Sequence, residues 1–268
     1  MMELEINDSK RCIASFGGKC PYNCAHCYTF IDKYDTEKIQ SIPEIVDNLR
    51  DKQFNIIYIS GQRENFVKPQ DGLELCEQLF REFCTDIMIT TRNVFNKEEL
   101  GRLERLNEKM KQTNRDLYVC SSIPALASYK KIEPSELMPL PQKRIEFLKD
   151  VRSLGIFSIL TLRPLFPDPF IPISEPLAII EQCKDFVDAV ISSGVVIHES
   201  TLSRLKGFPE NVDKKRQPIM SCLKRNVDVD YVNVEKELLQ IRNCCERLGL
   251  HFEKDSLSVV KYLKERNG

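Results

Sequence analysis

Three cysteines occur within eight residues in the segment SFGGKCPYNCAHCYTF, residues 15–30. A structural zinc site needs four ligands, and Cys20, Cys24 and Cys27 supply three. A redox pair of Cys24 with Cys27 would leave Cys20 without a role. An iron–sulfur cluster, normally held by four thiolates, fits better, because three thiolates on one short loop leave one iron open to a small-molecule ligand.

The spacing Cys20-x3-Cys24-x2-Cys27 resembles the signature of the radical SAM superfamily. His26 stands just before the third cysteine, where that family usually has an aromatic residue, and the loop follows the first β-rich run, as in the family. The resemblance implies a [4Fe–4S] cluster whose open iron chelates S-adenosylmethionine (SAM). It also implies reductive cleavage of SAM to a 5′-deoxyadenosyl radical that takes hydrogen from a substrate, with an electron donor such as flavodoxin or ferredoxin.

The same resemblance assigns SAM contacts to the segment YISGQREN, residues 58–65. The family has a Gly-Gly-Glu-type turn here, whose backbone binds the SAM amino group. Ser60 and Gly61 keep the place of that turn. Gln62 replaces the second glycine, and Glu64 stands one position later than usual.

Later β-rich runs end on further candidate SAM contacts. Ser121 and Ser122 match a position near the ribose or the carboxylate, and Arg163 in LRPLFP suits a bidentate contact with a carboxylate. The adenine is expected beside His26 and the backbone around 195–197. The implied cofactor contacts are His26, Ser60, Gly61, Gln62, Glu64, Ser121, Ser122 and Arg163. No residue is assigned a catalytic role.

Short β-rich runs alternate with amphipathic helical patterns along the chain. The predicted strands are 11–16, 55–60, 86–91, 116–122, 157–163 and 194–200. The predicted helices between them are 42–52, 71–84, 97–111, 141–154 and 174–190. Six β–α repeats predict an α/β fold, a partial (β/α)6 TIM-like barrel, with its chemistry at the C-terminal strand ends.

The pattern changes after residue 200. We predict a radical SAM core barrel over 1–200 and a C-terminal helical extension over 201–268 that packs on the core. Cys222, Cys244 and Cys245 raise the question of an auxiliary cluster. Because adjacent Cys244 and Cys245 point in different directions on a helix, ordinary core thiols are the favoured interpretation.

Composition limits the class of protein and its partners. The 268 residues include 39 basic and 40 acidic side chains, so the net charge of −1 gives no overall attraction to nucleic acid or membranes. No apolar run approaches the roughly 20 residues of a membrane span, and the N-terminus does not resemble a secretory signal. We expect a cytoplasmic protein, in which most of the 11 cysteines are free thiols.

The leading hypothesis is a radical SAM enzyme that acts on an unidentified substrate. One alternative is a nucleic-acid-directed radical SAM repair or modification enzyme. The run RPLFP is similar to spore-photoproduct-lyase-like enzymes, and Lys214, Lys215 and Arg216 lie in a basic stretch, but nothing else links the chain to DNA. A non-catalytic metal-binding barrel is the other alternative, supported by Gln62. The sequence does not identify the substrate or the oligomeric state.

Overall fold

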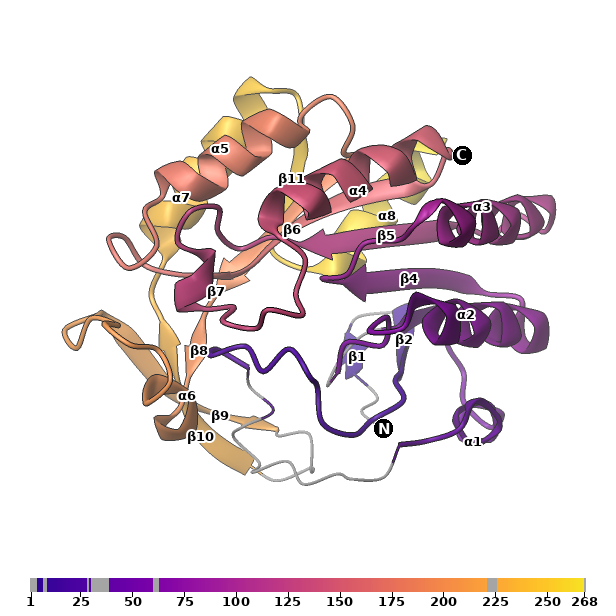
Figure 1. Cartoon of the computed structure of the whole chain (residues 1–268), viewed down its shortest axis with the longest axis horizontal. Helices are drawn as coiled ribbons and strands as arrows, with labels where there is room; N and C mark the ends of the chain where they lie inside the picture. The colour runs from indigo at the N-terminus through magenta and orange to yellow at the C-terminus, as the bar shows by residue number, and fades with distance from the viewer. Residues whose placement is uncertain are drawn as a thin grey trace.

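A computed structural model describes residues 4–6, 9–27, 29, 39–59, 63–220 and 226–267. One sheet of eight strands runs through the molecule in the order β1-β2-β3-β4-β5-β6-β7-β11 (Figure 1). The strands are β1 (Leu4–Ile6), β2 (Ser9–Ala14), β3 (Ile56–Ile59), β4 (Asp86–Thr91), β5 (Leu117–Ser122), β6 (Phe157–Leu165), β7 (Ala189–Gly194) and β11 (His251–Glu253). Seven of them are parallel, and only β1 is antiparallel to its neighbour.

The predicted α/β class and open barrel are confirmed, but the predicted count of six parallel strands is wrong. The seventh, β11, pairs in parallel with β7 and comes from the part of the chain that was expected to add helices only. Within the described ranges no pairing joins β11 to β1, so the barrel is not closed. Three residues are too few to show the alternation by which a strand is recognised in a sequence.

The predicted bounds of the last repeat are also wrong. The strand expected at 194–200 is β7 at Ala189–Gly194, and the helix expected to reach residue 190 is α5 (Ser174–Cys183). The first half of β7, residues 189–191, is a short run of buried apolar residues, because parallel strands are covered on both faces. Such a run does not differ in periodicity from a buried helix, which explains the misplaced boundary.

Six helices pack on the outer face of the sheet and one on its inner face. The outer helices are α1 (Ile42–Asp47), α2 (Pro69–Phe83), α3 (Lys97–Gln112), α4 (Pro141–Ser153), α5 and α7 (Glu235–Arg247). The inner helix is α8 (Ser256–Asn267), whose Val259, Val260 and Leu263 pack among inward-facing strand residues. Within the described part of the chain, no helix combines the length and apolarity needed to cross a bilayer.

Local signals explain where several helices begin and end. Asn96 and Glu99 form a capping box at the start of α3, each side chain bonded to the other's backbone N–H at 3.0 and 2.7 Å. Pro141 occupies the first turn of α4, as predicted, where its missing N–H is not needed. After α4, Gly155 adopts a φ of +67°, the left-handed conformation expected of a terminating glycine.

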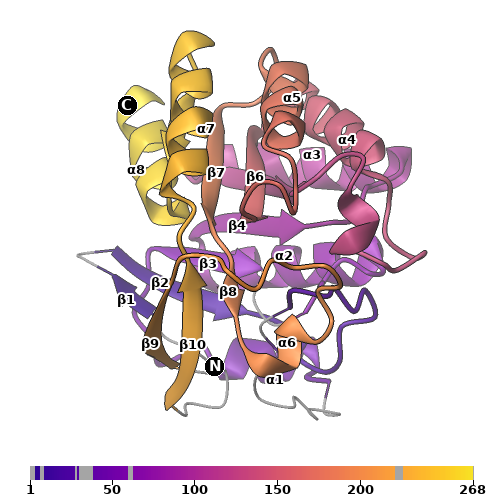
Figure 2. The same cartoon turned by 90° about the vertical axis from the view of Figure 1, so that its left-hand side faces the viewer.

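A second, three-stranded sheet lies beside the main one. It consists of β8 (Val196–Ile197), β10 (Asn226–Val232) and β9 (Lys214–Met220), in that order and all antiparallel. Figure 2 shows these strands and the short helix α6 (Glu199–Leu202) below β7, away from α7 and the upper part of α8. Sequence periodicity did not predict β9 or β10.

Candidate functional site

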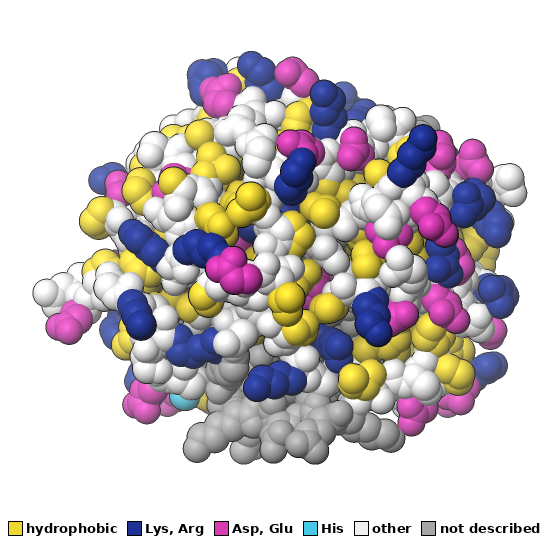
Figure 3. Space-filling view, in the orientation of Figure 1, with side chains coloured by type: hydrophobic (Ala, Val, Ile, Leu, Met, Phe, Trp, Pro, Cys, Tyr) yellow, Lys and Arg dark blue, Asp and Glu magenta, His cyan; other side chains and the backbone are white. Residues whose placement is uncertain are grey.

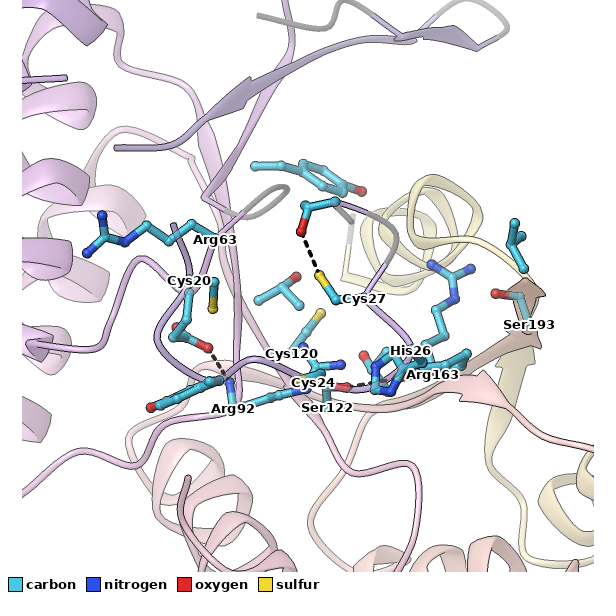
Figure 4. Close-up of a pocket in the computed structure, with 18 of the residues that line it drawn as sticks. Cys20, Cys24, His26, Cys27, Arg63, Arg92, Cys120, Ser122, Arg163 and Ser193 are labelled. Atoms are coloured by element: carbon cyan, nitrogen blue, oxygen red, sulfur yellow. Dashed lines mark hydrogen bonds between the residues drawn. The ribbon is translucent and has the colours of Figure 1, made fainter. Parts of the chain in front are cut away.

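A cavity of about 540 Å³ lies at the C-terminal ends of the parallel strands and reaches into the inner face of the sheet (Figure 4). Ser122, Arg163 and Gly194 line it from the ends of β5, β6 and β7. Cys20, Cys24 and Cys27 line it from the loop that follows β2. The predicted location of the site, at the carboxyl ends of parallel strands, is therefore where the structure brings these residues together.

The cysteine loop, residues 17–27, is held in place by a few specific contacts. Asn23 has a φ of 50°, a left-handed conformation that an asparagine tolerates. Arg204 Nη2 donates to both Asn23 O and Asn23 Oδ1, at 2.9 and 2.8 Å. Ala25 N donates to Ile132 O at 2.9 Å. These bonds come from segments far away in the sequence, so the tertiary fold positions the three cysteines.

All three cysteines are free thiols in partly or fully buried surroundings. Burial raises the pKa of Cys24 to about 12 and also raises the pKa of Cys20. Cys27 Sγ and Thr29 Oγ1 lie 3.0 Å apart, within hydrogen-bonding distance. A cysteine side chain binds metals as the thiolate, so the assembly of a metal cluster on this loop would release the protons of the thiols.

The donor set fits a cluster with three protein ligands. Within the described ranges, no three His, Cys, Asp or Glu side chains converge closely enough to hold a single metal ion. A cubane does not require such convergence, because each thiolate binds a different iron. Cys20, Cys24 and Cys27 all face one cavity, and the cavity leaves room for a further ligand beside them.

A network of buried charges runs from the cavity into the core behind the cysteine loop. Glu64 accepts from Phe66 N and Thr91 Oγ1 through Oε1, at 3.0 and 2.8 Å, and from Arg92 N through Oε2, at 2.7 Å. Burial raises the pKa of Glu64, and these three donors oppose the rise. Arg92 Nε in turn pairs with Glu133 Oε1 at 2.9 Å. The network thus ties the ends of β3 and β4 together beside the cavity.

Four of the eight predicted cofactor contacts line the cavity. Those present are His26, Glu64, Ser122 and Arg163. Ser121 is fully buried and is not among the lining residues, because consecutive residues of a strand face opposite sides of the sheet. The predicted contacts Ser60, Gly61 and Gln62 lie outside the described residues.

His26 and Arg163 differ in their surroundings. The imidazole of His26 packs edge-on against Phe166, with ring centroids 5.8 Å apart, and burial lowers its pKa to about 3, so the ring is neutral. Arg163 Nη2 donates to the backbone oxygen of Lys254, just before α8. In Figure 4, Arg163 and Ser193 lie on the opposite side of the view from Cys20 and Arg63.

Several cavity residues were not predicted from the sequence. Arg11, Tyr58 and Thr161 face inward from positions within strands, where sequence alone suggests ordinary packing. Their common signal is a polar side chain at an inward-facing position of a predicted strand. Arg11 is the clearest case, because an arginine within a strand of a parallel sheet needs a partner or a ligand.

The remaining candidate features that the structure describes do not line the cavity. Cys244 and Cys245 are buried in the core beneath α5 and α7 together with Cys183, and Cys222 lies outside the described residues. On the hairpin of the small sheet, Lys214 pairs with Asp230 at 2.9 Å. Figure 3 shows basic and acidic side chains interspersed over the visible face.

Comparisons with known proteins give a likeness of fold. No protein-family model matches the chain, and no curated protein matches it. Among solved structures, SuiB of Streptococcus suis bound to S-adenosylmethionine aligns with a TM-score of 0.60 and 12% identity. The alignment covers 92% of this chain and 50% of SuiB. SuiB bound to its precursor peptide SuiA aligns with a TM-score of 0.61 at 12% identity, covering 92% and 48%. The chain therefore has the fold of about half of SuiB.

Proposed function

We propose that this chain is a radical SAM enzyme. The observation that carries the proposal is the placement of Cys20, Cys24 and Cys27, three free thiols on one loop that face a single cavity at the ends of parallel strands. The shared fold with SuiB, one of whose structures has S-adenosylmethionine bound, supports the same proposal. The alignment covers 50% of SuiB, so nothing that SuiB binds besides S-adenosylmethionine is proposed for this chain.

Cys20, Cys24 and Cys27 would hold a [4Fe–4S] cluster through their thiolates. Once bound, the cluster would supply the electron for reductive cleavage of SAM, and the resulting 5′-deoxyadenosyl radical would take a hydrogen atom from the substrate. His26 offers a neutral ring beside the loop, and Ser122 offers a hydroxyl at the end of β5. Glu64 stays engaged with the backbone and orients the loop after β3, because both its oxygens already accept hydrogen bonds.

The test is anaerobic reconstitution with iron and sulfide, followed by SAM and dithionite in place of the natural electron donor. We expect about four irons and four sulfides per chain, with 5′-deoxyadenosine detected by mass spectrometry. Cys24→Ala should abolish both cluster binding and 5′-deoxyadenosine, because it leaves two of three protein ligands.

Cys84→Ser is the matched control, because Cys84 is an exposed free thiol at the end of α2. It should leave the iron content and the 5′-deoxyadenosine yield unchanged. About one zinc per chain and no sulfide would instead support the non-catalytic metal-binding alternative. A cluster-loaded protein that produces no 5′-deoxyadenosine would contradict the enzymatic proposal.

A further inference from the structure

Two arginines extend into the cavity from the inner face of the sheet. Arg11 lies on β2, three residues before the strand ends, and pairs in register with Ile56 of β3. Its backbone is therefore within the sheet, and the cysteine loop begins only after the strand ends. Arg163 lies on β6 across the sheet from Arg11. Both line the cavity together with Tyr58 and Ser256, the first residue of α8.

Both guanidiniums retain unused hydrogen-bonding capacity. Arg11 Nε and Arg163 Nε are buried from solvent without a hydrogen-bond partner among the described residues. The Arg11 guanidinium lies 4.7 Å from the centre of the Tyr58 ring, a cation–π contact that positions the charge. Arg163 donates one N–H to the backbone oxygen of Lys254. A buried donor without a partner is costly unless a ligand accepts from it.

The electrostatics of the two arginines also favour an anion. Burial lowers the pKa of Arg163, and the like charge of Arg11 lowers it further, against the opposing effects of Cys120, Asp255 and Tyr58. Asp255 is already engaged, since it accepts from Ser258 N and Oγ at 2.9 and 2.7 Å at the start of α8. An anion between the guanidiniums would relieve their repulsion.

The rest of the described cavity wall does not supply that anion. Its one carboxylate is Glu64, whose oxygens are occupied, whereas the cations are Arg11, Lys19, Arg63, Arg92 and Arg163. Arg92 is paired with Glu133, and Arg63 donates to Gly17 O at 3.0 Å. Lys19 is exposed, so Arg11 and Arg163 are the cations that enter the cavity from the inner face of the sheet and face no available carboxylate in its wall.

We propose that Arg11 and Arg163 bind an oxyanion of the substrate, a carboxylate or a phosphate. This inference rests on the proposed function, because it identifies the substrate of the proposed radical reaction as an anionic molecule. The planar fork of a guanidinium matches both oxyanions through paired N–H donors. Ser256 adds a hydroxyl at the N-terminus of α8, where the helix dipole favours negative charge.

The experiment titrates inorganic phosphate and, separately, acetate into the metal-free protein by calorimetry. Arg11→Gln should weaken the binding of the preferred anion about tenfold or more, the usual effect of losing a charge-assisted bond. Preference for phosphate or for acetate identifies which oxyanion the substrate carries. Because no cluster is needed, this result is independent of whether the protein is a radical SAM enzyme.

Arg63→Gln is the matched control, since it removes the same charge from another part of the cavity wall. It should leave anion affinity within about twofold of the wild type. Absence of binding to the wild type, or an equal loss in Arg63→Gln, would overturn the proposal. If Arg11→Gln does not fold, Arg11→Lys replaces it. Lysine keeps the positive charge but lacks the paired N–H donors of the guanidinium. An unchanged affinity for phosphate or acetate in Arg11→Lys would count against the proposal.

A second arm separates the substrate's anion from the carboxylate of SAM, the contact that the sequence suggested for Arg163. On the reconstituted protein, Arg11→Gln and Arg163→Lys should leave SAM affinity within about twofold of the wild type. A loss of SAM affinity that parallels the loss of phosphate or acetate binding would assign the two arginines to SAM and refute a substrate subsite.

Discussion

Glu133 and Arg144 form an ion pair in which neither side chain is exposed to solvent. Arg144 Nη2 donates to Glu133 Oε2 at 2.5 Å, and Arg144 Nη1 donates to Ser122 O at 2.6 Å. The pair therefore connects the end of β5, where Ser122 faces the cavity, to Arg92 on the other oxygen of Glu133. Such a pair contributes little net stability, but removing one member leaves the other charge buried with less compensation.

Arg144→Met should lower the free energy of unfolding by about 3–5 kcal/mol, because it leaves Glu133 buried with Arg92 as its remaining partner. Denaturant unfolding measures the change. Glu133→Gln with Arg144→Met should recover part of the loss, because the buried carboxylate that needed Arg144 is then absent. A double variant no more stable than Arg144→Met would contradict this explanation.

The acid range gives an independent check on the same pair. Burial alone would raise the pKa of Glu133, but Arg144 and Arg92 lower it below its ordinary value of 4.5. Stability from a lowered carboxyl pKa is complete above the unfolded value and is lost as pH falls through the folded value. The wild type should thus lose stability below pH 4.5 by an amount that the double variant does not show. This difference isolates Glu133 from Glu64, whose pKa burial raises.

Among the helices, α2 and α3 each contain a glycine, and their surroundings differ. A Cβ added at Gly72 of α2 would lie 2.3 Å from Phe66 Cδ1, whereas one at Gly101 of α3 would meet only Arg105 Nη1 at 3.6 Å. Phe66 belongs to the segment whose backbone N–H binds Glu64. The absence of a side chain at Gly72 lets α2 pack closely against the loop that orients Glu64.

The two glycines should respond to alanine with opposite signs. Gly72→Ala should destabilise the protein by about 1–3 kcal/mol, because the methyl group would overlap a fully buried ring. Gly101→Ala should stabilise it by about 0.5–1 kcal/mol, because alanine loses less backbone entropy in a helix. Thermal unfolding measures both, and a stabilising Gly72→Ala would rule out the close approach.

At the scale of the molecule, α8 closes the inner face of an open barrel. Its apolar side chains pack against inward-facing residues of β3 to β7, including Tyr58 and Tyr118, and Ser256 at its start reaches the cavity. The C-terminal part of the chain therefore contributes twice: α8 forms part of the cavity wall through Ser256, and β11 extends the sheet. An open barrel without this helix would expose a large apolar surface.

Leu263→Ala should cost about 2–5 kcal/mol of unfolding free energy, because Leu263 is 2% exposed and packs inside the barrel. Leu239→Ala on α7 is the matched control: that side chain is 55% exposed and its loss should change stability by at most about 0.5 kcal/mol. Denaturant unfolding compares the two. Equal effects would mean that α8 does not pack within the sheet.

The sequence by itself determined the features that depend on local spacing. The interval between Cys20, Cys24 and Cys27, their position after the first strand, and the alternation of strands with helices are all encoded within short segments. Ser122 and Arg163 could be expected near the site because the ends of parallel strands meet at one edge. The same reasoning could not separate Ser122 from Ser121, because that requires knowing which face of β5 points inward.

Only the tertiary structure decided the features that depend on pairing between distant segments. Three residues at His251–Glu253 become a parallel strand because β7 offers them an edge, and nothing in those residues encodes it. Arg11 and Arg163 likewise line one cavity although they are about 150 residues apart in the sequence, because the sheet and α8 bring their strands together. The periodicity of apolar residues in the sequence predicts which face of a helix or strand is buried. It does not predict which other element packs against that face, because this depends on the tertiary fold.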